Sequence, residues 1–285
     1  MTFRKLNGTP PKIALPEGAI DTHIHFFDSS RFGAEEGGPG LVADALVEHY
    51  EQVQKWLGLE RVVITQGNGY QFNNRCTLDA LYHFGKNARA IVAIKPNEIT
   101  DQEIDSMTEQ GVRGARIMDI WQGAIGLEGL LAVNARVKPF GWNLIVQFDG
   151  NEMVEHAPLL SQIEGEYVLD HTAKFLEPVS VDDPAFIALL KLIDRGNCYV
   201  KLSGYYETSK VGTPGYDDVA TMAKALIAHA PERILWATNW PHNMATNADI
   251  YPDDAHLVDL INEWAGSDKI RQQIFVDNPS KLYGF

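Results

Sequence analysis

The sequence is poor in cysteine and in positive charge. It has two cysteines, Cys76 and Cys198, in 285 residues, too few for the disulfide framework of a small secreted domain. We therefore expect a chain that works in the reducing cytoplasm. Lysine and arginine number 24 against 38 aspartates and glutamates, a formal net charge of −14. This charge argues against broad binding of nucleic acid or of an anionic membrane, but it does not exclude a locally basic pocket.

Long apolar runs are also missing. No stretch approaches the roughly 20 apolar residues that a membrane-spanning helix needs. The opening residues, MTFRKLNGTPPKIALPEG, lack the apolar centre of a signal peptide. Their prolines predict an irregular arm over residues 1–18, followed by one domain over residues 19–285. No G-x-G-x-x-G follows the first apolar segment, so a Rossmann dinucleotide site is not supported.

The sequence does contain eight short apolar segments, each ending in polar residues. They are AIDTHIH (19–25), RVVITQG (61–67), ARAIVAI (88–94), VRGARIM (112–118), NLIVQFD (143–149), EYVLDHT (166–172), NCYVKLSG (197–204) and RILWATNW (233–240). Short β-branched runs without simple polar alternation predict strands that are buried on both faces.

Helical patterns fill the gaps between these segments. Thr100 and Glu103 predict a capping box at the start of a helix that ends at Gly111. Helices are also predicted after Asp183, over residues 216–230 and over residues 254–265. An eightfold alternation of strand and helix predicts an α/β fold, a single (β/α)8 TIM barrel. An open, doubly wound sheet is the alternative.

The active sites of such barrels lie where the strands end. His23 and His25 close the first segment, and alternate side chains of a strand share a face, so we expect both in the barrel mouth. His171 closes the sixth segment, and Asn239 and His242 close the eighth. Imidazoles placed together in this way can bind a metal, hold an anion or move protons near neutral pH.

These motifs resemble those of the amidohydrolase superfamily, in particular its second amidohydrolase family. That family carries H-x-H on strand one, a histidine on strand six and T-D-W-P-H on strand eight. Here the corresponding residues are DTHIH (21–25), DH (170–171) and TNWPH (238–242), with a closing NPSKLYGF. The resemblance covers the chain from Ala19 to Phe285. It implies a (β/α)8 barrel and, in many members, a divalent metal held by the histidines and the strand-eight aspartate.

The metal-binding pattern is incomplete in this sequence. Asn239 replaces the strand-eight aspartate, and a neutral amide is a poor ligand for a transition metal and no general base. Metal-binding relatives place a ligand on strand four, where this chain has Arg116, and a guanidinium would repel a dication. We therefore expect no catalytic metal. The alternative is one divalent ion, such as zinc, held by His23, His25 and His171.

A closer resemblance is to a branch of the family that processes lactones without a metal. It includes D-galactarolactone isomerases and, more distantly, 2-pyrone-4,6-dicarboxylate lactonases. The stretches VITQGN, GARIMD, VQFDGN, LLKLIDRGN, HAPERI and TNWPHN are especially similar to the isomerases. His23 departs from the isomerase pattern, and this departure leaves a hydrolase open.

The resemblance implies an enzyme of sugar-acid catabolism that acts on a small anionic lactone. Arg116 suits the free carboxylate because a guanidinium forms a two-pronged fork, and Lys201 could assist as a point charge. Other residues expected to bind the substrate are His23, Asn68 and Gln147. The amides of Asn68, Gln147 and Asn239 can donate hydrogen bonds to hydroxyls or to a developing oxyanion.

The expected reaction is the conversion of a sugar-diacid δ-lactone to its γ-lactone. A base removes the proton of a substrate hydroxyl, whose oxygen then attacks the lactone carbonyl. A base that titrates near neutral pH favours histidine, with His171 as first choice and His25 or His242 as partner acid. In a lactone hydrolase, the alternative, the same base would activate water. A metal-dependent decarboxylase and a non-catalytic sugar-acid binder are further alternatives, and the oligomeric state is not determined.

Overall fold

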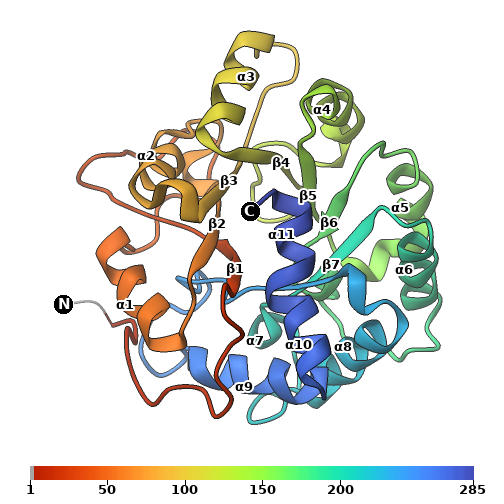
Figure 1. The fold of residues 1–285 in the computed structure, drawn as a ribbon. Coiled ribbons are helices and arrows are strands. Elements are labelled where there is room, and N and C mark those ends of the chain that lie inside the picture. Colours follow the sequence, from red (N-terminus) through yellow and green to blue (C-terminus); the bar gives the residue numbers. More distant parts are fainter. Residues whose placement is uncertain (1–2) are drawn as a thin grey trace.

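A barrel of parallel strands surrounded by helices forms the core of the computed structural model, which describes residues 3–285 (Figure 1). The strands are β1 (Ile20–Ile24), β2 (Arg61–Thr65), β3 (Ala88–Val92), β4 (Val112–Met118), β5 (Asn143–Gln147), β6 (Tyr167–Leu169), β7 (Cys198–Leu202) and β8 (Ile234–Trp236). Each strand pairs in parallel with the next along the chain. The predicted (β/α)8 barrel is thereby confirmed.

The barrel closes between β8 and β1 through backbone hydrogen bonds beyond the end of β8. The amide of His25 donates to the carbonyl of Trp240 at 2.9 Å, and the amide of Asn239 donates to the carbonyl of His23 at 3.2 Å. Closure therefore sets the T-N-W-P-H segment directly beside the H-x-H segment, although more than 200 residues separate them in the sequence.

The helices lie outside the strands, most of them in a ring around the barrel (Figure 1). They are α1 (Val47–Leu57), α2 (Arg75–Phe84), α3 (Asp101–Gln110), α4 (Leu130–Val137), α5 (Met153–Leu160), α6 (Pro184–Asp194), α7 (Tyr205–Thr208), α8 (Asp217–His229), α9 (Asp254–Ala265), α10 (Asp268–Gln272) and α11 (Asn278–Tyr283). Shorter turns are η1 (Asn68–Tyr70), η2 (Gly85–Asn87), η3 (Leu127–Gly129), η4 (Lys138–Phe140), η5 (Gly150–Glu152), η6 (Thr172–Lys174), η7 (Pro231–Arg233) and η8 (Gln273–Asp277).

The helix signals in the sequence act as expected. Thr100 and Glu103 form the predicted capping box, and Gly111 ends α3 with φ 111°. Asp183 caps α6 by accepting a hydrogen bond from the amide of Ala185. All the predicted strand segments except 112–118 extend beyond the observed strands, and the excess is largest at β6, which ends at Leu169, and at β8, which ends at Trp236. The residues beyond these ends form turns that carry the site.

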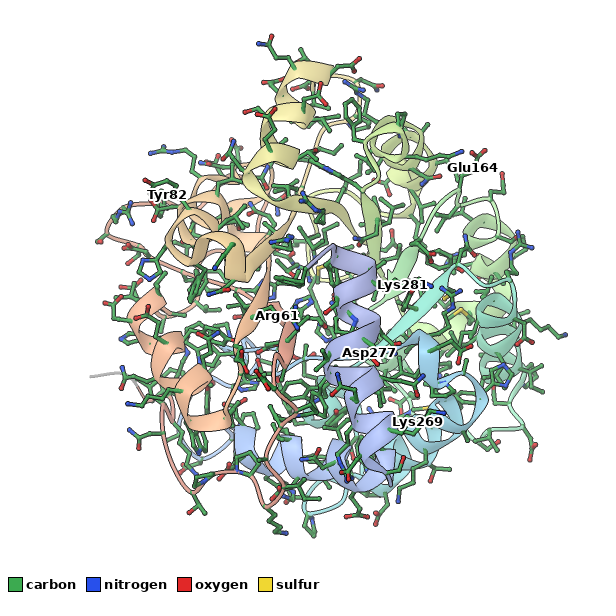
Figure 2. All side chains as sticks on the ribbon, viewed as in Figure 1. Arg61, Tyr82, Glu164, Lys269, Asp277 and Lys281 are labelled. Atoms are coloured by element: carbon green, nitrogen blue, oxygen red, sulfur yellow. The ribbon has the colours of Figure 1, made fainter. Side chains whose placement is uncertain are left out.

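The two ends of the barrel differ. One interior layer of apolar side chains packs against Tyr283 of α11, and it consists of Ile20, Val63, Ile91, Ile145, Val168, Tyr199 and Leu235. Helix α11 therefore lies across the barrel where the strands begin (Figure 1). Arg61, at the start of β2, and Lys281, on α11, mark this covered face in Figure 2. The opposite end, where the strands finish, is left for a ligand.

Residues 3–18 form no helix or strand. They contact the outer helices α1 and α9, since the indole nitrogen of Trp56 donates to the carbonyl of Thr9 at 2.8 Å and Nδ2 of Asn262 donates to the carbonyl of Ile13 at 3.2 Å. The boundary at residue 18 between arm and barrel stays a prediction. Within the described residues, no helix combines the length and the apolar character that crossing a membrane requires.

Candidate active site

A cavity of about 280 Å³ opens at the end of the barrel where the strands finish. Its polar lining is His25, Asn68, Arg116, Gln147, His171, Glu207, Asn239 and Asn243. Its apolar lining includes Phe27, Leu41, Val42, Met118, Trp121 and Met244. A small pocket lined by both polar and apolar side chains suits a compact ligand that has both hydroxyl groups and C–H faces.

The structure brings most of the predicted site residues together. His25, Asn68, Arg116, Gln147, His171 and Asn239 all line the cavity. His23, Lys201 and His242 are not part of the lining, and each of them is fully buried. These three residues lie behind the pocket wall, so the structure places them where they can orient other groups.

The guanidinium of Arg116 on β4 has N–H donors that no acceptor in the described part of the chain uses. Its Nη1 donates to the carbonyl of Gln66 at 2.8 Å and to Oδ1 of Asn68 at 3.1 Å, and its Nη2 donates to Oε1 of Gln147 at 3.1 Å. Its Nε is buried without a partner, and no carboxylate forms an ion pair with this guanidinium within the described residues. Buried donors are nearly always satisfied, so a ligand is expected to supply the missing acceptor.

The bond from Arg116 also orients Gln147. A guanidinium can only donate, so the side-chain oxygen of Gln147 must face it. The amide nitrogen of Gln147 is then directed away from Arg116, and it has no acceptor among the described residues. Gln147 thus offers the pocket a hydrogen-bond donor.

His171 lies just past β6, in a left-handed backbone conformation that is rare for residues other than glycine. The four residues His171, Thr172, Ala173 and Lys174 have φ values of 50°, 56°, 56° and 50°. Left-handed turns of this length cost roughly 1–2 kcal/mol per residue and persist where the surrounding structure holds them. This turn brings two side chains, His171 and Lys174, to the site.

The ring of His171 is anchored on one side and free on the other. Its Nδ1 lies 2.8 Å from Oγ of Ser203, whereas its Nε2 lies 3.7 Å from Oδ2 of Asp170, beyond hydrogen-bonding distance. Burial lowers the pKa of His171 to about 4, against the opposing effect of Asp170. The imidazole is therefore neutral at neutral pH and can accept a proton.

His23 and His25 are neutral and paired edge to face. The carbonyl of Thr65 can only accept, so Nδ1 of His25, 2.8 Å away, carries the hydrogen of that bond. Nε2 of His25 then accepts from Nε2 of His23 at 3.1 Å. Burial lowers the pKa of His25 to about 3, with a further contribution from Arg116, and burial lowers the pKa of His23 well below its ordinary value.

Asp170 and Lys201 form a fully buried ion pair beneath the histidines. The Nζ of Lys201 lies 3.2 Å from Oδ1 of Asp170 and 3.2 Å from Nδ1 of His23. Burial alone would raise the pKa of Asp170, but His171, His23 and Lys201 hold it well below its usual range. Burial lowers the pKa of Lys201, and Asp170 opposes that effect.

This cluster includes a group that could hold a metal ion. His23, Asp170 and His171 each offer a ligand atom, and these atoms lie within 4.8 Å of one another. Asp170 takes the third position in place of His25, since Nε2 of His25 is turned toward His23. The charges do not favour a dication, because the Lys201 ammonium already contacts two of the three ligand residues. The donor set therefore fits a resident divalent metal poorly.

Asn239 is held by a network that fixes its amide. Its Nδ2 donates to Oη of Tyr206 and to Oε1 of Glu207, both at 2.9 Å. Turned over, the amide would set its oxygen against the carboxylate of Glu207, so this orientation is the stable one. Both amide hydrogens are consumed, and the pocket receives the carbonyl oxygen. This arrangement opposes the sequence-based expectation that Asn239 donates to an oxyanion, and the part that Asn239 plays in the reaction stays a prediction.

His242 supports this network from behind. Its Nε2 lies 2.9 Å from Oδ1 of Asp254, and its Nδ1 lies 2.7 Å from Oη of Tyr206. Burial raises the pKa of Tyr206 well above its ordinary value, so the hydroxyl keeps its proton and donates a hydrogen bond to Nδ1 of His242. With both ring nitrogens engaged, His242 positions Tyr206 and, through it, Asn239.

Sequence reasoning missed Glu207, Lys174 and Trp121. Glu207 accepts a hydrogen bond from Lys174, whose ammonium lies 4.3 Å from the ring centre of Trp121. Although burial would raise the pKa of Glu207, Lys174 and His171 bring it below its ordinary value. Glu207 follows β7 by only a few residues, so extending the strand-end rule into the loops would have found it.

Comparisons with known proteins agree on one family. The family described as Amidohydrolase matches residues 20–285. D-galactarolactone isomerase of Agrobacterium fabrum (strain C58) is 44% identical over 282 residues, which cover 98% of this chain and 96% of that protein. A 4-sulfomuconolactone hydrolase of Rhizobium radiobacter is 30% identical over 285 residues, covering 98% and 94%. An apo crystal structure from Agrobacterium tumefaciens superposes with a TM-score of 0.95 at 43% identity, covering 99% of both chains.

Proposed function

The chain belongs to the amidohydrolase family, and from that premise we propose that it isomerises the δ-lactone of a sugar diacid to the γ-lactone without a metal. The family and the likeness to D-galactarolactone isomerase, both predicted from the sequence, are confirmed by the comparisons. The buried, unpaired thiols of Cys76 and Cys198 are compatible with the cytoplasmic location that we expect.

The observation that carries the proposal is the unpaired guanidinium of Arg116 facing the neutral imidazole of His171 across one small cavity. Arg116 binds the free carboxylate of the substrate through its unused N–H bonds. The lactone ring then extends toward the ends of β6, β7 and β8, where His171 and Asn239 lie.

His171 acts as the base. It takes the proton of the substrate hydroxyl that will form the five-membered ring, and the hydroxyl oxygen attacks the lactone carbonyl carbon. As the imidazole becomes positive, the carboxylate of Asp170, 3.7 Å from Nε2, stabilises it. Asn239 directs the attack, because its carbonyl oxygen can accept a hydrogen bond from the same hydroxyl.

The same imidazole can finish the reaction. In the tetrahedral intermediate, the attacking oxygen and the old ring oxygen are bound to one carbon, so both lie within reach of His171. His171 returns its proton to the ring oxygen, the carbon–oxygen bond of the δ-lactone breaks and the γ-lactone remains. Gln147 donates to the carbonyl oxygen, which carries the negative charge of the intermediate. No water is consumed.

The remaining predicted residues act through these groups. His25 forms part of the pocket wall, and its two ring nitrogens are bound by Thr65 and His23. Lys201 contacts both Asp170 and His23 and fixes them, and Asn68 fixes Arg116. No separate partner acid is required, which removes that role from His25 and His242.

A lactone hydrolase is the second candidate, favoured by the 30% identity to 4-sulfomuconolactone hydrolase. There His171 would activate a water molecule in place of the substrate hydroxyl. Proton NMR of metal-stripped protein mixed with fresh D-galactaro-δ-lactone separates the two. The γ-lactone appearing ahead of the open diacid supports the isomerase, the diacid appearing first supports the hydrolase, and no acceleration contradicts both.

A further inference from the structure

The buried charges around the cavity are almost completely paired. Asp170 and Lys201 neutralise one another beneath the histidines, at 3.2 Å. Glu207 and Lys174 form a second ion pair in the pocket wall. The pKa directions agree with these charges, since both carboxylates are held below their ordinary values.

Arg116 remains as the one unbalanced charge among the described residues that surround the cavity. Its side chain is buried, its hydrogen bonds go to neutral oxygens, and its Nε has no partner. Two other buried carboxylates, Asp21 and Asp254, do not line the cavity: Asp21 accepts hydrogen bonds from Tyr50 and Thr238, and Asp254 lies against His242. Burying an unpaired charge is costly, so a ligand with one negative charge would balance the charge of the cavity lining.

We propose that the pocket selects lactones with a single free carboxylate, and that Glu207 excludes ligands with a second anionic group. This inference rests on the proposed function and names its substrate class. One carboxylate neutralises Arg116. A second would have no cation of its own, because Lys201 and Lys174 are already paired.

The placement of Glu207 makes the exclusion directional. Arg116 belongs to β4, and Glu207 follows β7, three strands further around the barrel. A ligand held by Arg116 extends toward Glu207, whose Oε1 and Oε2 already accept from Asn239 and Lys174. Carboxylate oxygens can accept further hydrogen bonds, so substrate hydroxyls can donate to Glu207. A like charge at that end is repelled in a poorly solvated cavity.

A matched pair of inert ring acids tests the proposal. 2-Furoate carries one carboxylate and furan-2,5-dicarboxylate carries two on the same ring, and neither can be isomerised or hydrolysed. Ligand-observed NMR titration of the full-length protein gives both dissociation constants. We expect the wild type to bind 2-furoate at least about tenfold more tightly. Equal or tighter binding of the dicarboxylate, or no binding of 2-furoate, overturns the proposal.

Two variants separate charge balance from shape. Glu207→Gln leaves Lys174 unpaired, so the preference for one carboxylate should fall to less than about threefold. The double variant Lys174→Met/Glu207→Gln restores the original balance and should recover part of the preference, because a second carboxylate again finds no cation although Glu207 no longer repels it. A preference that stays the same in Glu207→Gln contradicts the role of Glu207. Circular dichroism checks folding, and the wild-type ratio and the double variant still decide if Glu207→Gln does not fold.

These experiments can contradict the proposed function and the charge selection independently of one another. Selective binding without isomerisation of the δ-lactone would remove the proposed function and leave the charge selection in place. Isomerisation with no preference between the two furans would do the reverse.

Discussion

Asn239 and Glu207 are joined by a hydrogen bond of 2.9 Å, in which the amide nitrogen of Asn239 donates to Oε1 of Glu207. The second amide hydrogen goes to Tyr206, so the face of Asn239 toward the ligand is an acceptor. The replacement of the family's strand-eight aspartate thus keeps an oxygen in the pocket and removes its charge. The following predictions depend on this arrangement.

Asn239→Ala should lower kcat by about tenfold to a hundredfold with little change in KM. The carboxylate contact at Arg116 is untouched, whereas the attacking hydroxyl loses the acceptor that aligns it. Steady-state kinetics with the δ-lactone checks this prediction. Asn87→Ala, at an exposed asparagine, is the matched control. An effect confined to KM would show that Asn239 only contributes to binding.

Arg116→Met should raise KM by about a hundredfold or more, because the charged fork that holds the carboxylate is lost. Stability should respond differently. Removing an unpaired buried cation offsets the loss of its three hydrogen bonds, so the free energy of unfolding should fall by no more than about 1 kcal/mol. Denaturant titration and kinetics together check this, with Arg195→Met at an exposed position as control. Unchanged KM would refute the carboxylate site.

The pH profile of kcat/KM should follow the depressed pKa of His171, about 4. The neutral imidazole is the active form, so activity is retained above that pKa and is lost as the pH falls through it. His83→Gln, on an exposed surface, should leave the profile unchanged. An acid limb centred near 6.5, the ordinary value for histidine, would contradict a buried, neutral base.

The same shift predicts how stability depends on pH. The unfolded state binds the proton of His171 below about pH 6.5, while the folded state binds it only near its pKa of about 4. The contribution of His171 to the free energy of unfolding is therefore present above about pH 6.5. It declines toward pH 4 by up to about 1.4 kcal/mol per pH unit. In His171→Gln, denaturant midpoints should vary less with pH over this window than in the wild type, and an equal dependence would contradict the shift.

Gly204→Ala should lower both activity and stability. Gly204 has φ 64°, and a Cβ there would lie 3.3 Å from the His171 ring. The backbone conformation alone costs about 1 kcal/mol for alanine, and the methyl group displaces the base. Gly141→Ala provides the control, since its φ is 73° and a Cβ there meets no atom within 4 Å. Equal losses of activity in the two variants would refute the positioning of His171.

Prolonged dialysis against a chelator should leave kcat within about twofold of its starting value. Lys201 already supplies the positive charge beside Asp170 and His23, so no dication is needed there. Metal analysis of the dialysed protein and reconstitution with zinc complete the measurement. A loss of activity that zinc reverses would establish a metal site at His23, Asp170 and His171.

Much of this architecture could be predicted from the sequence, because strands that are buried on both faces are recognisable as short, continuous apolar segments. The ends of β6 and β8 could not, since the turns after them are held by tertiary contacts against local preference. His171 adopts φ 50° where an apolar strand pattern predicts extended backbone. His171 lines the cavity as the sequence predicts, but its backbone conformation differs from the predicted one.

Part of the group of residues that lines the cavity could be predicted from the sequence. Arg116, Gln147 and His171 were identified because they lie at strand ends. The direction of the Asn239 amide depends on Glu207 and Tyr206, which belong to a loop whose sequence carries no periodic signal. Residue types at strand ends thus show which groups meet, while their hydrogen-bond partners decide which of them donate.

The most direct test of intramolecular acyl transfer is isomerisation in water enriched in oxygen-18. The γ-lactone formed in the first turnovers is analysed by mass spectrometry, with the uncatalysed reaction run in parallel. If the substrate hydroxyl attacks its own lactone carbonyl, the γ-lactone carries no label from the solvent. Label in the carbonyl group of the early product would show that water opens the ring first, and would contradict the mechanism.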